Sequence, residues 1–155
     1  SGESPRRTDE DVWRVFREPL DRVLVTPRLK PKRIVAPNYE YEFERSWKNE
    51  VWHVYEPVSF DMVESASMLD KANRWVGRAT SLMDSADHFQ IHMLLGEPTD
   101  DRLKTTFVKV QNILNKMPGK TELIRESEAE AFAEELAREV RGHQAEKPAE
   151  PTPHT

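Results

Sequence analysis

The feature that most constrains this chain is a run of alternating aromatic and charged residues that leads directly into a long amphipathic segment. Residues 39–48, YEYEFERSWK, alternate ring side chains with glutamate or serine, and Arg45 interrupts the pattern. Because successive side chains of a β-strand point to opposite faces, the alternation predicts a strand with one buried face. Residues 51–60, VWHVYEPVSF, predict a second such strand.

Asn49 and Glu50 lie between these two strands and are expected to form a two-residue hairpin turn. Asparagine accepts the left-handed backbone conformation that such turns need, although Glu50 stands where glycine is usual. This turn pairs Trp47 with Trp52, whereas a three-residue turn would place Trp52 among the glutamates of the other face. The side chains expected on the aromatic face are Tyr39, Tyr41, Phe43, Trp47, Trp52, Val54, Val58 and Phe60.

Residues 61–86 follow the hairpin and carry apolar side chains in two rows with a spacing of seven. One row is Met62, Leu69, Val76 and Met83, and the other is Met68, Trp75 and Leu82. A stripe of this width is typical of a helix that lies on a sheet, and Asp61 with Glu64 is expected to cap its start. We therefore expect this helix to cover the aromatic face of the hairpin.

The other elements follow from shorter patterns of the same two kinds. Thr8 and Asp11 form a capping box for a first helix, which Pro19 is expected to end or kink. The remaining predicted elements are an edge strand at 32–36, a strand at 89–96, a helix at 100–117, a short strand at 120–126 and a helix at 127–142.

These elements predict an α+β fold with a mixed sheet that is covered by helices. An antiparallel hairpin leads the sheet, and helical crossovers between the later strands favour a parallel βαβ portion. After a short first helix the order is ββ(β)αβαβα. This strand and helix order resembles that of ribonuclease H-like folds, and such an order hosts many functions.

The length of 155 residues suits a single domain, which we place at residues 8–143. Residues 1–7 and the tail at 144–155, QAEKPAEPTPHT, contain no large apolar side chain and are expected to be disordered. Ser1-Gly2 is typical of the residues that tag removal leaves, which favours a piece of a longer protein.

The resemblance to ribonuclease H-like folds makes a chemical demand, because two-metal nucleases need several carboxylates around two ions. The strand at 89–96 contains no carboxylate, so the required set is incomplete, and alternating glutamates are also simply the solvated face of a strand. We predict no catalytic residues. The carboxylates on offer are Glu40, Glu42 and Glu44 on the first strand, Glu64 or Asp70 on the helix, and Glu97 beyond the later strand.

Histidines are the second group of side chains that could bind a metal ion. His88 and His92 share a face of the predicted strand but lie about 13 Å apart along it, and nothing in the sequence brings His53 to either of them. The chain has no cysteine and only five glycines, which are scattered, so thiolate sites and a glycine-rich phosphate loop are excluded. We predict neither a metal nor a cofactor.

Two features favour binding rather than catalysis. Trp47 and Trp52 near the hairpin turn either stabilise the hairpin, by roughly 0.2–1 kcal/mol, or form an exposed hot spot. The basic run RLKPKR at 28–33 is either an ordinary linker or a contact for phosphate or an acidic partner. The candidate binding residues are Trp47, Trp52, Lys30, Lys32 and Arg33.

Three segments carry a resemblance to a group of proteins. YEFERSWKNEVWHVYEPVSFD, KANRWVGRATSL and QNILNKMPGKTELIRESEAEAFAEELA are similar to uncharacterised bacterial proteins from prophage or mobile-element neighbourhoods, over residues 30–141. The resemblance implies a bacterial, cytoplasmic protein that is part of a larger one. It implies no site residues.

Our leading hypothesis is a non-catalytic interaction domain that binds another protein or another domain of its parent chain. The alternative is a divergent ribonuclease H-like nuclease or nucleic-acid-binding module. The net charge of -5 disfavours nucleic acid as the partner, because phosphate contact needs a basic footprint. No apolar run approaches the roughly 20 residues of a membrane helix, so we expect no membrane association.

Overall fold

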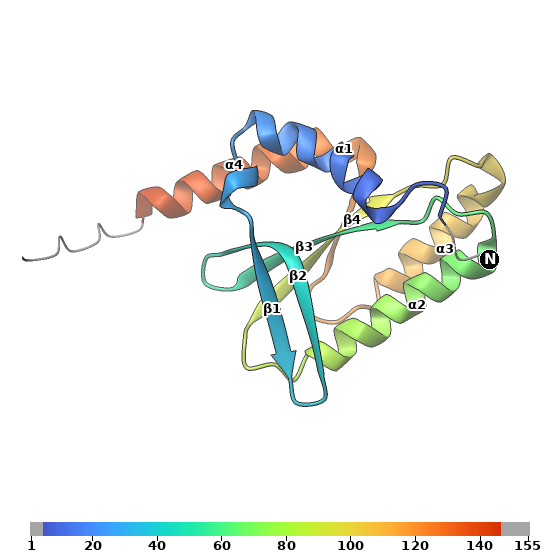
Figure 1. Cartoon of the computed structure of the whole chain (residues 1–155), viewed down its shortest axis with the longest axis horizontal. Helices are drawn as coiled ribbons and strands as arrows, with labels where there is room; N and C mark the ends of the chain where they lie inside the picture. Colours follow the sequence, from blue (N-terminus) through green and yellow to red (C-terminus); the bar gives the residue numbers. More distant parts are fainter. Residues whose placement is uncertain (1–4, 147–155) are drawn as a thin grey trace, which may run out of the picture.

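A five-stranded mixed sheet forms the centre of the structure, and its strands lie side by side in chain order (Figure 1). The computed structural model describes residues 5–146. The first three strands pair antiparallel, and the last two are added in parallel. The strands are β1 (Lys30–Ala36), β2 (Tyr39–Lys48), β3 (Trp52–Ser59), β4 (Phe89–Gly96) and β5 (Glu122–Arg125).

Two helices cover each face of this sheet. α2 and α3 pack together on one face, and α1 and α4 pack together on the other (Figure 1). The order after α1 is β-β-β-α-β-α-β-α, which confirms the predicted α+β class with its hairpin and βαβ portion. The helices are α1 (Asp9–Arg22), α2 (Ser65–Leu82), α3 (Lys104–Leu114) and α4 (Ala129–Glu146).

The first hydrophobic core lies between the sheet and α2 with α3, and it contains most of the aromatic face of the hairpin. The ring of Tyr41 meets those of Phe43 and Trp75 edge to face, with centroid distances of 4.8 and 5.5 Å. Phe43 is fully buried, and Trp75 is 5% exposed. The prediction that the amphipathic helix covers these rings is therefore confirmed for Tyr41 and Phe43.

Trp47 does not belong to this core, which corrects the prediction that it shares a face with Phe43. A β-bulge interrupts β2, because β1 advances from Lys30 to Lys32 while β2 advances from Ser46 to Phe43. The extra residue reverses the alternation of side chains beyond the bulge. Trp47 therefore points to the other face, where it joins the second core.

The hairpin turn also differs from the prediction. Lys48 pairs with Trp52, so the turn spans residues 49–51, and Trp47 stands opposite His53 rather than Trp52. The Asn49 side chain closes the turn by accepting the N–H of Val51 at 3.0 Å. The longer turn shifts the pairing of β2 with β3 by one residue, and the bulge reverses the faces of the β2 side chains that follow it. For β3 the two effects cancel. β3 therefore still directs Val54 into the first core, as predicted.

The second core lies between the sheet and the pair α1 and α4. Phe16 of α1 and Phe132 of α4 meet edge to face at 6.2 Å, and Tyr55 of β3 meets Phe132 at 5.8 Å. Leu94, at the middle of β4, is fully buried in this core, while its neighbours Met93 and Leu95 are fully buried in the first. β4 thus has two dry faces, as expected for a strand with helices on both sides.

Three local predictions have different outcomes. The capping box of Thr8 and Asp11 is present, with bonds of 2.9 and 3.1 Å. Pro19 does not end α1, which continues to Arg22 with the proline buried inside it. Asp61 does not cap α2, since its carboxylate accepts from Thr99 and Arg7 instead.

The predicted tails overlap the folded part of the chain. Arg7, which we assigned to the N-terminal tail, is bound by three segments of the domain. α4 continues beyond the predicted boundary at 143, as far as Glu146, the last residue that the structure describes. Residues 1–4 and 147–155 lie outside the described residues.

Replacing Phe43 by alanine tests the first core. The substitution removes a fully buried ring from between the sheet and α2, so we expect the free energy of unfolding to fall by about 3–5 kcal/mol. Urea denaturation measures it. Val35→Ala is the matched control, because Val35 is 52% exposed on β1 and should change stability by less than about 0.5 kcal/mol. Equal small losses for both variants would contradict the assignment of Phe43 to the core.

Candidate functional site

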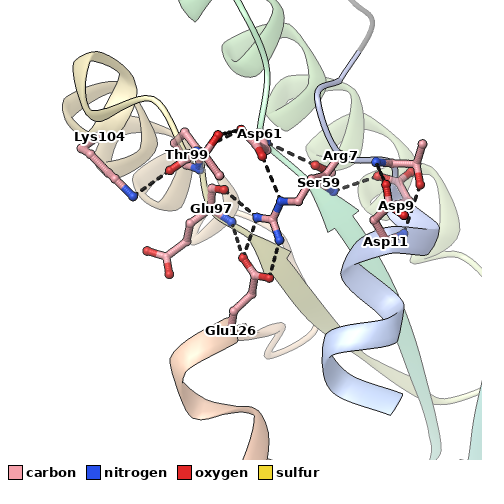
Figure 2. A network of polar contacts seen from close by, with 11 residues as sticks. Arg7, Asp9, Asp11, Ser59, Asp61, Glu97, Thr99, Lys104 and Glu126 are labelled. Carbon is pink, nitrogen blue, oxygen red and sulfur yellow. Dashed lines mark hydrogen bonds and ion pairs between the residues drawn. The ribbon is translucent and has the colours of Figure 1, made fainter. Parts of the chain in front are cut away.

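Four clusters of polar side chains within residues 5–146 are candidate sites, and the first surrounds Arg7 (Figure 2). Its guanidinium lies between two carboxylates, with 2.9 Å from Nε to Asp61 and 2.7 Å from Nη1 to Glu126. Nη2 donates to the carbonyl of Glu97 at 2.8 Å. The cluster lies at the ends of the parallel strands β3 and β4, where α/β sheets often bind ligands.

The carboxylate of Asp61 is satisfied entirely by the chain itself. Its Oδ1 accepts both the N–H and the hydroxyl of Thr99 at 2.9 Å, and its Oδ2 accepts from Arg7. Burial alone would raise the pKa of Asp61, but these hydrogen bonds outweigh it and hold the pKa below its ordinary value. Since Arg7 occupies this end of the sheet, we interpret the cluster as a structural clamp that fastens the start of the chain.

Removing the guanidinium tests this interpretation. Arg7→Ala would leave the carboxylate of Asp61, whose side chain is 1% exposed, without its cation. We expect the free energy of unfolding to fall by about 3–5 kcal/mol, measured by urea denaturation. Arg6→Ala is the control, because the Arg6 side chain is 45% exposed and stands 3.9 Å from Asp100. A loss no larger than that of the control would contradict the clamp.

The second cluster centres on Glu56, at a cavity of about 350 Å³ that is lined by α1, α2, β2 and β3. The hydroxyl of Tyr41 donates to Glu56 at 2.5 Å, and burial raises the pKa of Glu56 to about 7. The guanidinium of Arg78 lies 4.5 Å from the ring centroids of both Tyr41 and Trp75. The cavity wall therefore mixes cations with carboxylates and holds one carboxyl group that is half protonated near neutral pH.

The raised pKa of Glu56 makes a prediction about stability and pH. The folded chain binds this proton more tightly than the unfolded chain, so the free energy of unfolding falls as pH rises from about 4.5 to 7. The full effect well above pH 7 is about 3 kcal/mol. Gln at this position keeps an acceptor for Tyr41 and carries no charge. Glu56→Gln should therefore be more stable than the natural chain at pH 8 and similar to it at pH 5.

Urea denaturation of both proteins at the two pH values measures the difference directly. Comparing the two chains at each pH removes the contribution of every other titrating group. A Glu56→Gln variant that is equally destabilised at both pH values would show that the carboxylate is ionised in the folded state.

The third cluster is a chain of hydrogen bonds through two histidines, which the sequence did not reveal. The parallel pairing of β3 with β4 brings His53 Nδ1 to 2.8 Å from His92 Nε2. At one end His92 Nδ1 lies 2.7 Å from Glu122, and at the other His53 Nε2 lies 3.1 Å from the Asn49 oxygen. The histidines also line a cavity of about 470 Å³ beside α4.

The hydrogen bonds of this cluster determine how many protons the two histidines carry. Both ends are acceptors, because the Asn49 oxygen also accepts the N–H of Val51. Three hydrogen bonds need three protons, whereas two neutral imidazoles carry only two. Burial and the neighbouring His92 lower the pKa of His53 to about 4. The fully bonded form therefore holds one extra proton over the two imidazoles, and the hydrogen bond with His92 lowers the pKa of Glu122.

The fourth cluster is a pocket of about 520 Å³ at the hairpin end of the sheet, which we call the Trp52 pocket. The ring of Trp52 is half-buried, with Lys32 Nζ at 4.5 Å and Lys48 Nζ at 5.4 Å from its centroid. The pocket is lined by Arg28, Lys30, Pro31, Ser46, Trp47, Lys48, Trp52, Val140, His143 and Gln144. It combines aromatic surface with basic side chains.

Trp47 forms the inner wall of the Trp52 pocket and is itself fixed from behind. It is 8% exposed, it stacks on the ring of His53 at 5.6 Å, and its Nε1 donates to Tyr55 at 2.8 Å. An indole held in this way is a rigid surface. Trp52, in contrast, is more exposed and belongs to neither hydrophobic core among the described residues.

The structure brings together most of the predicted binding residues. Lys30, Trp47 and Trp52 line the pocket, and Lys32 lies over the ring of Trp52. Arg33 does not join them, because its side chain points away to an exposed ion pair with Glu40 at 2.9 Å. Sequence reasoning included Arg28 in the basic run at 28–33 without choosing it as a candidate, and it missed Lys48 and His143. Lys48 could have been found from its place beside the turn, whereas His143 comes from α4 and carried no sequence signal.

The carboxylates considered for a nuclease lie apart. Glu40 pairs with Arg33, Glu64 precedes the first residue of α2, and Glu97 pairs with Arg125. Glu42 and Glu44 line the cavity of Glu56. Within residues 5–146, no three carboxylate or histidine side chains are grouped so that they could hold a metal ion.

Comparisons with known proteins do not add to this picture. No family model matches the chain, and no curated protein or solved structure matches it significantly. Among the described residues, none of the helices has the length and apolar character to cross a membrane.

Proposed function

We propose that this chain is a non-catalytic interaction domain that binds an acidic segment of another protein, or of another domain of its parent chain, in the Trp52 pocket. The observation that carries the proposal is the convergence of Trp47 and Trp52 with Arg28, Lys30 and Lys48 in a chain of net charge -5. Because the molecule as a whole is acidic, an acidic ligand is attracted to this pocket with its basic and aromatic walls rather than to the rest of the surface.

The charges of the pocket support this proposal. Within residues 5–146, Arg28, Lys30 and Lys48 form no ion pair with a carboxylate, whereas Lys32 pairs with Asp87 at 3.1 Å. Each exposed ion pair with a ligand contributes only about 0.2–1 kcal/mol. The larger share of the binding energy should come from the aromatic surface of Trp52, since tryptophan is among the residues enriched in binding hot spots.

Substitutions in the pocket test the proposal. Proteins that co-purify with the chain from its host are quantified, and the affinity of the recovered partner is measured by calorimetry. Trp52→Ala should weaken that affinity by about 30-fold or more, the effect of losing a hot-spot residue. Lys48→Glu should also weaken it, by reversing a charge on the pocket wall. Arg33→Glu reverses an equally exposed charge outside the pocket and serves as the control.

The outcomes separate clearly. A partner that is lost with Trp52→Ala and Lys48→Glu but kept with Arg33→Glu supports the proposal. A partner that binds all three variants equally would place the interface elsewhere and contradict it.

One observation favours nucleic acid as the second candidate ligand. Single-stranded nucleic acids bind where bases stack on aromatic rings beside basic side chains, and the Trp52 pocket offers both. The acidic net charge opposes this ligand. Fluorescence polarisation with single-stranded oligonucleotides at low and moderate salt decides between the two. Tight, salt-dependent binding that Trp52→Ala abolishes would replace the acidic segment by nucleic acid.

The nuclease form of the alternative has a separate test. Titration with Mg²⁺ or Mn²⁺ followed by NMR should leave the signals of Glu40, Glu42, Glu64 and Glu97 unchanged if the chain is a binding domain. We also propose, from the resemblance alone, that the chain is bacterial and cytoplasmic and that it is part of a larger protein.

A further inference from the structure

The hydrogen-bonded pair of His53 and His92 has a proton requirement that links β3, β4 and β5 to the hairpin turn. The Asn49 oxygen is fixed as an acceptor, because it accepts the N–H of Val51, so His53 Nε2 must donate to it. At the other end, the hydrogen bond with His92 lowers the pKa of Glu122, which is therefore a carboxylate and also accepts. The extra proton of the fully bonded form is consequently held by the two imidazoles.

Loss of this proton breaks one of the three hydrogen bonds, since two neutral imidazoles donate only twice. The bond between His92 and Glu122 is short, at 2.7 Å, and hydrogen bonds to ionised groups are the stronger kind. The bond to Asn49 is the longest of the three, at 3.1 Å, and its acceptor is neutral. The Asn49 bond is therefore the one to break. His53 then keeps its proton on Nδ1, between the two rings, and releases the turn.

The surroundings of the pair favour one extra proton and oppose a second. Within residues 5–146, no lysine or arginine lines the cavity beside the histidines, and four carboxylates do: Glu122, Glu128, Glu135 and Glu139. Glu50 in the turn also favours a charged His53, whereas burial and the neighbouring His92 hold the pKa of His53 at about 4. Tyr55, which stacks on His92 at 4.8 Å, stays neutral because burial raises its pKa.

The pair lies directly behind the inner wall of the Trp52 pocket. The ring of His53 stacks on that of Trp47, with centroids 5.6 Å apart and an angle of 18° between the rings. A positive charge on the pair therefore attracts the indole through a cation–π interaction. It also adds to the basic character that the arginine and the lysines of the wall give the pocket.

We propose that His53 and His92 form a proton switch for the Trp52 pocket. With the extra proton bound, the hydrogen bonds tie the turn to β4 and β5, and an acidic ligand binds the pocket more tightly. Without it, His53 releases Asn49 and the affinity falls. Imidazoles change charge between about pH 5 and 8, where an acidic ligand keeps its own charge. The effect on affinity alone rests on the proposed function.

Long-range ¹H–¹⁵N spectra of the histidine rings test the switch in the full chain, because they report which ring nitrogen carries a proton. The Nε2 proton of His53 should be present at about pH 5 and absent at about pH 8, while the proton between the two rings persists. The pair should lose one proton in all over this range. Loss of two protons would show that the rings titrate independently and would overturn the proposal.

Glu122→Gln is the variant that separates the switch from an ordinary titration. The amide of glutamine can donate to His92 Nδ1, so two neutral imidazoles then complete all three hydrogen bonds. We expect the Nε2 proton of His53 to persist at pH 8 in this variant, which should fold because the Glu122 side chain is 51% exposed. Glu135→Gln removes a carboxylate from the same cavity and should titrate as the natural chain does. Equal behaviour of His53 in the natural chain and in Glu122→Gln would contradict the switch.

The affinity for the recovered partner is measured by calorimetry at pH 6 and pH 8. His143 is a further imidazole on the pocket wall, so the chains compared all carry His143→Gln. With Glu122 present, binding should be about threefold tighter at pH 6, the effect of one added charge near the pocket. With Glu122→Gln, most of this dependence should disappear.

The two measurements separate the possible failures. A switch seen by NMR without a change in affinity would overturn the regulation of the pocket. A partner that is lost with Trp52→Ala, combined with an unchanging His53 Nε2, would leave the proposed function standing and reject this inference. A partner that ignores every substitution in the pocket would reject the proposed function, while the NMR result would still decide the proton switch.

Discussion

The register between β2 and β3 is the constraint on which the rest of the structure depends. A bulge between β1 and β2 reverses the alternation of side chains along β2, and a three-residue turn shifts the pairing of β2 with β3 by one residue. As a result, the side chains of β3 point to the same faces as in a hairpin with a two-residue turn and no bulge. Among the aromatic residues of the hairpin, Trp47 alone changes face. Trp47 thereby closes the second core, and Trp52 remains at the rim of the sheet with lysines around its ring.

The parallel pairing of β3 with β4 positions both the two hydrophobic cores and the polar clusters. It places the middle of β4 between two dry faces, and it brings the side chains of His53 and His92 together. At the other end of the same strands, the guanidinium of Arg7 fills the place where a ligand often binds in sheets of this kind (Figure 2). The hairpin end therefore remains the open end, and the Trp52 pocket lies there.

Patterns with a fixed local period predicted most of the fold. The alternation in residues 39–48 and the stripe of α2 identified the hairpin and the helix that covers its aromatic face. The bulge escaped prediction because a single extra residue leaves both halves of the strand alternating normally. Arg45 and Ser46, where the apolar pattern breaks, were the visible sign of it.

The candidate site was only partly predictable for a different reason. Lys30 and Lys32 belong to one short basic run, and Trp47 and Trp52 flank one turn, so each pair was visible as a local pattern. The pairing of His53 with His92 and the contribution of His143 depend on contacts between distant segments, for which a single sequence carries no local signal. Arg33 belongs to the same basic run, but it does not line the pocket, and its side chain pairs with Glu40 across the strands.

The register of the hairpin is tested most directly by a two-dimensional NOE spectrum of the folded chain. The structure predicts cross-strand backbone contacts that join Lys48 to Trp52 and Trp47 to His53. Contacts that instead join Trp47 directly to Trp52 would show a two-residue turn. That result would return both indoles to one face of the sheet and contradict the account of the pocket.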